Sequence, residues 1–337
     1  MIFLNKIKNI IVSEWKFVLF LIALYILLQL PLNYYIIVGG GTSDISSRVE
    51  VSDSYKEKGS FNISYVTQLQ GTIFTYFLSY IIPTWERENA NLYKYDEKES
   101  IHDIDFRSDI DLLNANSTAT YWAYTLAGKD CVKVSSNLYV IVTFDEFNTN
   151  LKVGDEVLKI DGNHYDTIDE YKEYLQTKDD NSIVDIDIIR NGKNKKISSS
   201  VYTYDGKKIL GVGLEYISNY ETNPKLDIKF KSSESGPSAG LITTLEIYNQ
   251  LTKEDLTNGY KIAGTGTIEA DGSIGQIGGV EYKVLGASQD NVDYFLVPDG
   301  DNYDTAKKYI KEKKLKVKLI KVSTIDDAIE KLKKINR

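Results

Sequence analysis

The sequence has few of the residues that most often build hydrolytic, redox or metal sites. Its 337 residues include one cysteine, Cys131, and two histidines, His102 and His164. A single cysteine cannot form an intramolecular disulfide, and we expect Cys131 to be a small core residue. No HExxH motif, Cys/His cluster or EF-hand loop occurs, so we expect no metal site. GxxxxGK[ST] is also missing, which excludes a P-loop ATPase in this sequence, and we expect no cofactor.

Positive charge is not in excess. The formal net charge is −8, with 40 Lys and Arg against 48 Asp and Glu. This balance argues against a nucleic-acid partner. Basic clusters such as 311–314 alternate with apolar residues and are typical of solvated helix faces.

A serine in a turn of small residues is the first candidate nucleophile. Gly236-Pro237-Ser238-Ala239-Gly240 precedes a helix that is predicted by apolar residues on one face from Leu241 onward. Pro237 can preset the first helical φ, and the glycines let another backbone approach closely. Ser238 would then lie where the free N–H groups of the helix start converge, which favours an oxyanion. Taken alone, a serine in such a turn is more often only a helix cap.

Because histidine is scarce, a lysine is the remaining candidate for the general base of Ser238. Both histidines lie in polar segments, so a Ser-His-Asp triad would need a chance meeting. Lys283 follows a Gly-Gly pair and precedes Val284 and Leu285, so we expect apolar, close-packed surroundings. Desolvation there can lower the lysine pKa from about 10.4 to the range of about 7–8 that suits a base, at a cost of about 4 kcal/mol. A lone lysine is otherwise a solvated surface charge.

Three motifs in order resemble the proteolytic domain of Lon proteases over about residues 225–335. They are Pro237-Ser238-Ala239-Gly240, then Thr265-Gly266-Thr267-Ile268, then the glycine-rich run 272–279 followed by Lys283. The resemblance implies a C-terminal α/β domain in which Ser238 is the nucleophile and Lys283 its general base. It also implies that Thr265 supports the lysine and that the backbone at Pro237 and Ala239 holds the oxyanion. The family often has Asp before GPSAG, whereas this chain has Glu234-Ser235.

A second resemblance covers residues 131–210. The run LKVGDEVLKIDG at 151–162 is followed by a predicted helix from Thr167 to Leu175 and a hairpin at Asn191-Gly192. This arrangement resembles PDZ domains of bacterial membrane proteases, in which a peptide adds a strand beside the first strand. The resemblance places the peptide groove near Ser136 and the four residues after it, Asn137, Leu138, Tyr139 and Val140. The alternative is a small β module that only packs against its neighbour.

The N-terminal region predicts a membrane anchor. Phe17–Val38 is apolar with few interruptions, long enough for one transmembrane helix across about 30 Å of hydrocarbon. Lys6, Lys8 and Lys16 precede it and no basic residue follows before Arg48, so we expect a cytoplasmic N-terminus and an extracellular catalytic domain. A cleaved signal peptide is the rival interpretation.

The region between anchor and PDZ-like module is the hardest to interpret. We expect a flexible tether from Gly39 to Ser47, and a strand at Phe61–Val66. The apolar segment Ile73–Ile82 is too short to span a bilayer. Either it is a buried helix or, with Trp85 at its end, it lies against a membrane surface.

The predicted fold class is α+β multidomain, with a transmembrane helix, a PDZ-like β module and a C-terminal α/β Lon-type domain. The expected bounds are 1–41 for tail, anchor and tether, 42–130 for an extracytoplasmic α/β region, 131–210 for the PDZ-like domain and 211–337 for the proteolytic domain. This order resembles the membrane-anchored PDZ-containing Lon-like proteases of Gram-positive bacteria. It implies an ATP-independent serine endopeptidase that acts on exported or membrane proteins.

Two alternatives to that function stay open. One is a non-catalytic membrane scaffold whose PDZ-like groove binds protein C-termini. The other is cleavage limited to the chain's own tether. The expected partners are protein or peptide substrates, the membrane and no nucleic acid, and homo-oligomer formation is left open.

Overall fold

A computed structural model of the chain describes residues 13–335. It contains two compact units, Met1–Gly39 with Val66–Tyr93, and Gly40–Tyr65 with Lys94–Arg337. Strands β1 (Pro31–Asp44) and β3 (Ser60–Thr72) run from one unit into the other. The second unit holds every residue that the sequence singles out for catalysis or peptide binding.

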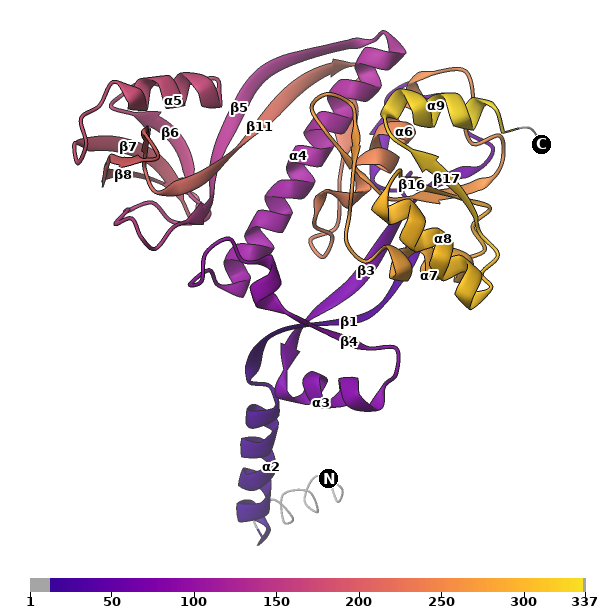
Figure 1. Ribbon diagram of the computed structural model, residues 1–337, viewed down its shortest axis with the longest axis horizontal. Coiled ribbons are helices and arrows are strands. Elements are labelled where there is room, and N and C mark those ends of the chain that lie inside the picture. The colour runs from indigo at the N-terminus through magenta and orange to yellow at the C-terminus, as the bar shows by residue number, and fades with distance from the viewer. Residues whose placement is uncertain (1–12, 336–337) are drawn as a thin grey trace, which may run out of the picture. The chain divides into compact units, whose positions relative to one another are not determined.

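The described part of the first unit contains the α-helices α2 and α3 and a short antiparallel pair of strands (Figure 1). Its elements are α2 (Trp15–Leu28), the first part of β1, the end of β3, α3 (Ile73–Ile81), β4 (Glu86–Asn89) and the 3-10 helix η1 (Ala90–Tyr93). β1 pairs with β4 from Tyr34 opposite Asn89 to Ile37 opposite Glu86.

The prediction of one helix over Phe17–Val38 is wrong. The helix ends at Leu28, and Pro31–Asp44 forms a strand. Pro31 disfavours helical backbone in the residue before it, and the Tyr-Tyr-Ile-Ile-Val run that follows has side chains that favour strands. An unbroken apolar run does not by itself distinguish helix from strand, which is why the sequence was misleading. Within residues 13–335, no helix is long and apolar enough to cross a membrane.

A mainly parallel sheet forms the centre of the second unit. Its strands run in the order β17-β16-β13-β3-β1-β4, and β17 (Lys318–Val322), β16 (Tyr294–Pro298), β13 (Lys261–Gly264) and β3 are parallel neighbours. Helices α6 (Gly240–Leu251) and α9 (Ile325–Lys333) pack on one face; α7 (Val280–Gln289) and α8 (Asp301–Lys313) pack on the other. This is the α/β layering that the sequence predicts for the C-terminal region.

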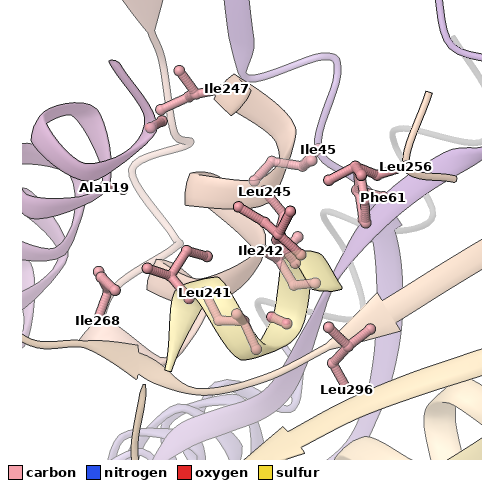
Figure 2. Packing of buried hydrophobic residues seen from close by; sticks show 14 of the residues in the cluster. Ile45, Phe61, Ala119, Leu241, Ile242, Leu245, Ile247, Leu256, Ile268 and Leu296 are labelled. Carbon is pink, nitrogen blue, oxygen red and sulfur yellow. The ribbon is translucent and has the colours of Figure 1, made fainter. Parts of the chain in front are cut away.

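Alternate residues of the strands supply the two sides of the core. Ile262 and Leu296 belong to the cluster under α6 and α9, whereas Ala263 and Phe295 belong to the cluster under α7 and α8. Figure 2 shows part of the first cluster, in which Ile242 and Leu245 of α6 lie toward Phe61, and Leu241 lies toward Ile268. Phe61 comes from β3, so a segment before the PDZ-like module completes the core of the C-terminal α/β layer.

The PDZ-like module is a five-stranded antiparallel sheet in the order β11-β5-β6-β7-β8, with one helix packed on it. Its elements are β5 (Asp130–Thr143), β6 (Glu156–Ile160), α5 (Ile168–Gln176), β7 (Ile183–Arg190), β8 (Lys193–Ser200) and β11 (Val212–Asn223). β9 (Tyr202–Tyr204) and β10 (Lys207–Ile209) form a separate hairpin. The predicted helix after Thr167 and the predicted hairpin at Asn191-Gly192 are confirmed.

The long helix α4 (Ile101–Ala127) contacts both the PDZ-like strands and the α/β core. Ser100 caps its start, and Gly128, with a φ of 63°, ends it. Ser117 Oγ donates a 2.6 Å hydrogen bond to the Ser218 carbonyl of β11, while Ala119 and Ala123 lie in the core cluster with α6. Two small strand pairs complete the unit, β2 (Val49–Val51) with β12 (Leu226–Ile228) and β14 (Thr267–Ile268) with β15 (Ile274–Gly275).

The expected tether at Gly39–Ser47 is not a free linker, because Gly40 and Gly41 belong to β1 and pack closely against α7. A Cβ on Gly40 would lie 2.6 Å from the Tyr282 carbonyl oxygen, and a Cβ on Gly286 would lie 2.6 Å from Gly41 Cα. Thr42 adds two 2.7 Å hydrogen bonds from its N–H and its hydroxyl to Asp290 Oδ2. The glycines therefore serve close packing between backbones, not flexibility.

Candidate active site

Ser238 lies in the 3-10 turn η2 (Pro237–Ala239), directly before α6. The turn begins at Gly236, whose φ of 85° and ψ of 158° suit glycine and strain other residues. Gly236 N–H donates a 2.8 Å hydrogen bond to the Ser108 carbonyl of α4, which fixes the start of the turn. Ser238 is half-buried, so its hydroxyl is within reach of a substrate.

Lys283 points at Ser238 from the first turns of α7. Its Nζ is 2.7 Å from Ser238 Oγ, although its side chain is almost completely buried, with 4% of the residue exposed. Val280 and Val284, its neighbours on α7, belong to an apolar cluster. Burial lowers the pKa of Lys283 to about 7. A neutral amine that can accept a proton is therefore accessible near neutral pH.

Thr265 joins the two residues at the carboxyl end of β13. It is fully buried, and Lys283 Nζ donates to its Oγ1 at 2.9 Å. The threonine hydroxyl in turn donates to the Ser238 carbonyl at 3.2 Å, and Thr265 N–H donates to the Leu296 carbonyl of β16 at 3.0 Å. Thr265 thus holds the lysine amine in position and is itself held by the sheet.

Backbone N–H groups surround the serine where an oxyanion would form. Those of Ser238 and Ala239 begin a helical segment, where N–H groups lack intrahelical acceptors and the helix dipole favours negative charge. Gly266 N–H donates to the Ser238 carbonyl at 3.0 Å. This bond fixes the plane of the peptide between Ser238 and Ala239, and so the direction of the Ala239 N–H. Pro237, predicted as an oxyanion residue, has no N–H and can only shape the turn.

Glu234 has a structural partner that the sequence did not reveal. Arg48, which is 5% exposed, forms an ion pair with its carboxylate, and Lys231 N–H donates to Glu234 Oε2 at 2.8 Å. Burial acts to raise the pKa of Glu234, but these hydrogen bonds outweigh it and the pKa is lowered. Glu234 therefore anchors the loop before Ser238 to the segment that follows β1, and no contact links it to the lysine amine among the described residues.

Neither histidine takes part in the site. His164 Nδ1 lies 2.9 Å from the Leu158 carbonyl in the PDZ-like module, and His102 is exposed on α4. In residues 13–335, no group of three or more His, Cys, Asp or Glu side chains could hold a metal ion. The chemistry at Ser238 therefore has to be explained with Lys283 and Thr265.

The predicted groove residues Asn137, Leu138, Tyr139 and Val140 do not lie on an open edge of the PDZ-like sheet. These lie in β5, which pairs with β11 along its length and with β6 at Tyr139, and Leu138 and Val140 are core residues. β11 is the edge strand. A cavity of about 400 Å³ lies between β11 and α5, and its apolar lining includes Tyr171, Leu175, Leu210 and Leu214. An added peptide strand needs an unpaired edge, and β11 offers such an edge on the side that faces α5.

Family models match both the C-terminal α/β region and the PDZ-like module. Residues 231–334 match the family model of the Lon protease (S16) C-terminal proteolytic domain, and residues 129–201 match that of the PDZ domain. The chain therefore carries a Lon-type proteolytic domain and a PDZ domain, and the first of these indicates a serine peptidase. No curated protein matches the chain.

Solved structures that are similar to this chain include isolated PDZ domains. The PDZ domain of an SdrC-like protein from Listeria monocytogenes is 27% identical, over 25% of this chain and 93% of that chain, with a TM-score of 0.24. The PDZ domain of an SdrC-like protein from Listeria innocua is 22% identical, over 23% and 92% of the two chains, with a TM-score of 0.22. A solution structure from Geobacillus thermodenitrificans is 22% identical, over 23% and 94%, with a TM-score of 0.21.

Proposed function

We propose that the protein is an ATP-independent serine endopeptidase that uses Ser238 and Lys283 as a catalytic dyad. The observation that carries this proposal is the buried lysine amine 2.7 Å from the serine hydroxyl, with Thr265 holding it from the other side. A buried lysine without a carboxylate partner costs stability, and that cost is understandable if the neutral amine is needed as a base.

The reaction follows from this geometry. Ser238 Oγ attacks the scissile carbonyl carbon while the neutral amine of Lys283 takes the hydroxyl proton. The N–H groups of Ser238 and Ala239 stabilise the resulting oxyanion. The ammonium of Lys283 then protonates the leaving amine, and the C–N bond breaks to give an acyl-enzyme on Ser238. A water molecule, deprotonated by Lys283, attacks the ester, and the proton returns to Ser238 as the acid product leaves.

The PDZ domain gives substrates a second binding site. We propose that an extended peptide pairs with the edge of β11 and places an apolar side chain in the cavity between β11 and α5. The bond from Ser117 Oγ to the Ser218 carbonyl occupies the β11 edge further along, so docking is confined to its first residues. The sequence contains no P-loop motif, so we expect substrates that are already extended or flexible.

We propose that the enzyme works at the outer face of the cell membrane. The apolar segment that ends at Leu30 would anchor it, with Lys6, Lys8 and Lys16 keeping the N-terminus cytoplasmic. The helix that the structure describes here supports a membrane environment, because none of the residues of α2 is buried although nearly all are apolar. Exported and membrane proteins are then the substrates within reach.

The test is cleavage by the full chain in vesicles of phosphatidylcholine and phosphatidylglycerol. A flexible polypeptide should be cut by the wild type with or without ATP, and Ser238→Ala should leave it intact. Binding of the polypeptide without any cleavage by the wild type would instead support the scaffold alternative. In intact cells, added protease should remove a C-terminal tag and spare an N-terminal one, and the reverse result would place the enzyme inside the cell.

A further inference from the structure

Helix α3 exposes its apolar face and turns its polar face toward the protein. Its nine residues, IFTYFLSYI, form the segment 73–81, and Ser79 is the one member of the helix that is buried. Phe77 is 63% exposed and Ile81 is 75% exposed, and with Phe74 they follow the i, i+3, i+7 spacing of a single helix face. In a water-soluble protein the apolar face of such a helix packs on the core and the polar face meets water.

Specific hydrogen bonds hold α3 in this orientation. Thr72 and Thr75 form a reciprocal cap at its start, with Thr72 N–H donating to Thr75 Oγ1 at 2.8 Å. On the inner face, Ser79 Oγ accepts a 3.2 Å hydrogen bond from Arg87 Nη1. The polar side of the helix is thus satisfied by the protein, and the apolar side is left facing outward.

The surroundings of this face have the composition of a membrane interface. The Arg87 guanidinium lies 3.8 Å from the ring centroid of Tyr80 and 5.7 Å from that of Tyr76. Tyr76 also contacts the ring of Tyr34, at 5.0 Å between centroids. Tyrosine rings with an arginine are typical of the headgroup level, where the ring bodies lie in apolar surroundings and the polar tips reach water or lipid phosphate.

The start of α3 is joined to the end of α2 by a backbone hydrogen bond. Ile73 N–H donates a 3.1 Å hydrogen bond to the Leu30 carbonyl, two residues after α2 ends, and Figure 1 shows α3 beside that end of α2. Apart from Lys16 in its first turn, α2 consists almost entirely of apolar residues and none of them is buried, so hydrocarbon suits most of its surface. A bilayer that holds α2 would therefore meet α3 where α2 leaves the apolar layer.

We propose that α3 lies flat in the headgroup region of a lipid bilayer, with Phe74, Phe77 and Ile81 inserted. This inference rests on the proposed membrane placement of α2 and adds a second, lateral contact. Two contacts would fix the orientation of the first unit on the membrane, whereas a single helix would let it rotate.

Site-specific quenching on the full chain tests this proposal. In a Cys131→Ser background, an environment-sensitive fluorophore is attached to a cysteine at position 81 (Ile81→Cys) or at position 183 (Ile183→Cys). Ile183 is the matched control, because it is an isoleucine with 70% exposure that lies in β7, outside the first unit. The proteins are reconstituted in phosphatidylcholine and phosphatidylglycerol vesicles and exposed to a lipid-borne spin label or to iodide in the water.

We expect the lipid-borne quencher to act about threefold more strongly at position 81 than at 183, and iodide to show the opposite preference. Equal access of iodide to both positions in vesicle-bound protein would overturn the proposal for α3 while leaving the anchor intact. Protection at position 81 from both quenchers would also overturn it, since a second protein copy would then cover the face. If the full chain does not sediment with vesicles at all, the membrane placement itself fails, whatever the result of the cleavage assay.

Discussion

Lys283 Nζ and Ser238 Oγ meet at 2.7 Å although 45 residues separate them in the chain. Ser238 lies in the turn directly before α6 and Lys283 lies in α7, and these two helices pack on opposite faces of the sheet. The two side chains meet at the carboxyl end of β13, where Thr265 follows the strand and contacts both residues. The carboxyl edge of a parallel sheet is where helix starts from both faces converge, and here it brings the proposed nucleophile and the proposed base together.

Removing the base should abolish turnover without unfolding the protein. Lys283→Met keeps the length and apolar stem of the side chain and removes the amine, so we expect kcat/KM to fall by at least about 10³-fold. Ser238→Ala should fall as far. Peptide cleavage is measured beside circular dichroism, and near wild-type turnover in Lys283→Met with an intact fold would falsify the dyad.

The pH dependence should reflect the buried lysine. Because burial lowers the pKa of Lys283 to about 7, the neutral amine increases as pH rises through that value. We therefore expect kcat/KM to increase about tenfold per pH unit well below the midpoint and to level off above it. The measurement is an initial-rate profile from pH 5 to about 10. A midpoint near the value of about 10.4 for a free lysine would show that the amine is solvated during catalysis.

Thr265 should matter for activity more than for stability. Thr265→Val keeps the volume and removes the hydroxyl that Lys283 Nζ contacts, so we expect kcat/KM to fall about tenfold. Thr120→Val is the control, because Thr120 is also buried and its hydroxyl bonds only to the Asn116 carbonyl of its own helix. Equal activity of the two variants would mean that Thr265 does not position the amine.

The peptide groove should lie at β11. Leu214→Arg places a charge in the cavity between β11 and α5, and we expect the affinity for an extended apolar peptide to fall at least about tenfold. Val134→Arg is the control, since it makes the same change of charge on the neighbouring strand β5, where Val134 is 56% exposed. Binding is measured by fluorescence anisotropy, and equal losses in both variants would argue against the groove at β11.

A buried carboxyl on α6 should make stability depend on pH. Glu246 is 1% exposed; burial raises its pKa to about 8, with Glu57 as a second cause, from an ordinary value of 4.5. Between these values the unfolded chain releases a proton that the folded chain keeps, so stability falls as pH rises. Glu246→Gln keeps the hydrogen bond with Gln250 and should stabilise the fold by about 2 kcal/mol at pH 8, with little effect near pH 4.5.

Thermal unfolding at both pH values checks the effect of Glu246→Gln. The exposed Glu330→Gln on α9 serves as the control for loss of one negative charge. If both variants shift the midpoint equally at pH 8, the effect comes from net charge and not from burial.

The motif residues could be predicted because their chemistry is local and distinctive. The resemblance of three ordered motifs to the Lon proteolytic domain, together with the scarcity of histidine, predicted Ser238, Thr265 and Lys283, which the structure brings together. The helix and strands of the PDZ-like module followed from clear periodicity and turn residues.

Long-range pairing decided the features that the sequence did not reveal. Nothing in the local pattern of 60–66 shows that β3 pairs with β13, about 200 residues later in the chain, or that Arg48 meets Glu234. The strand after Pro31 was hidden for the same reason, because its partner β4 lies beyond α3. The open edge of β11 likewise depends on strand order, which periodicity does not contain.

The packing of Gly40 and Gly41 against Gly286 limits how the enzyme can be produced in soluble form. A fragment that begins at residue 42, just after the apolar region, would lack the two glycines that cover α7 and expose the helix that carries Lys283. Low activity of such a fragment would then reflect a damaged base site and not an intrinsically weak protease. An expressed fragment should therefore begin at or before Pro31, so that it contains the whole of β1, the strand that reaches α7. Any apolar residues that it keeps before Pro31 should be kept in detergent.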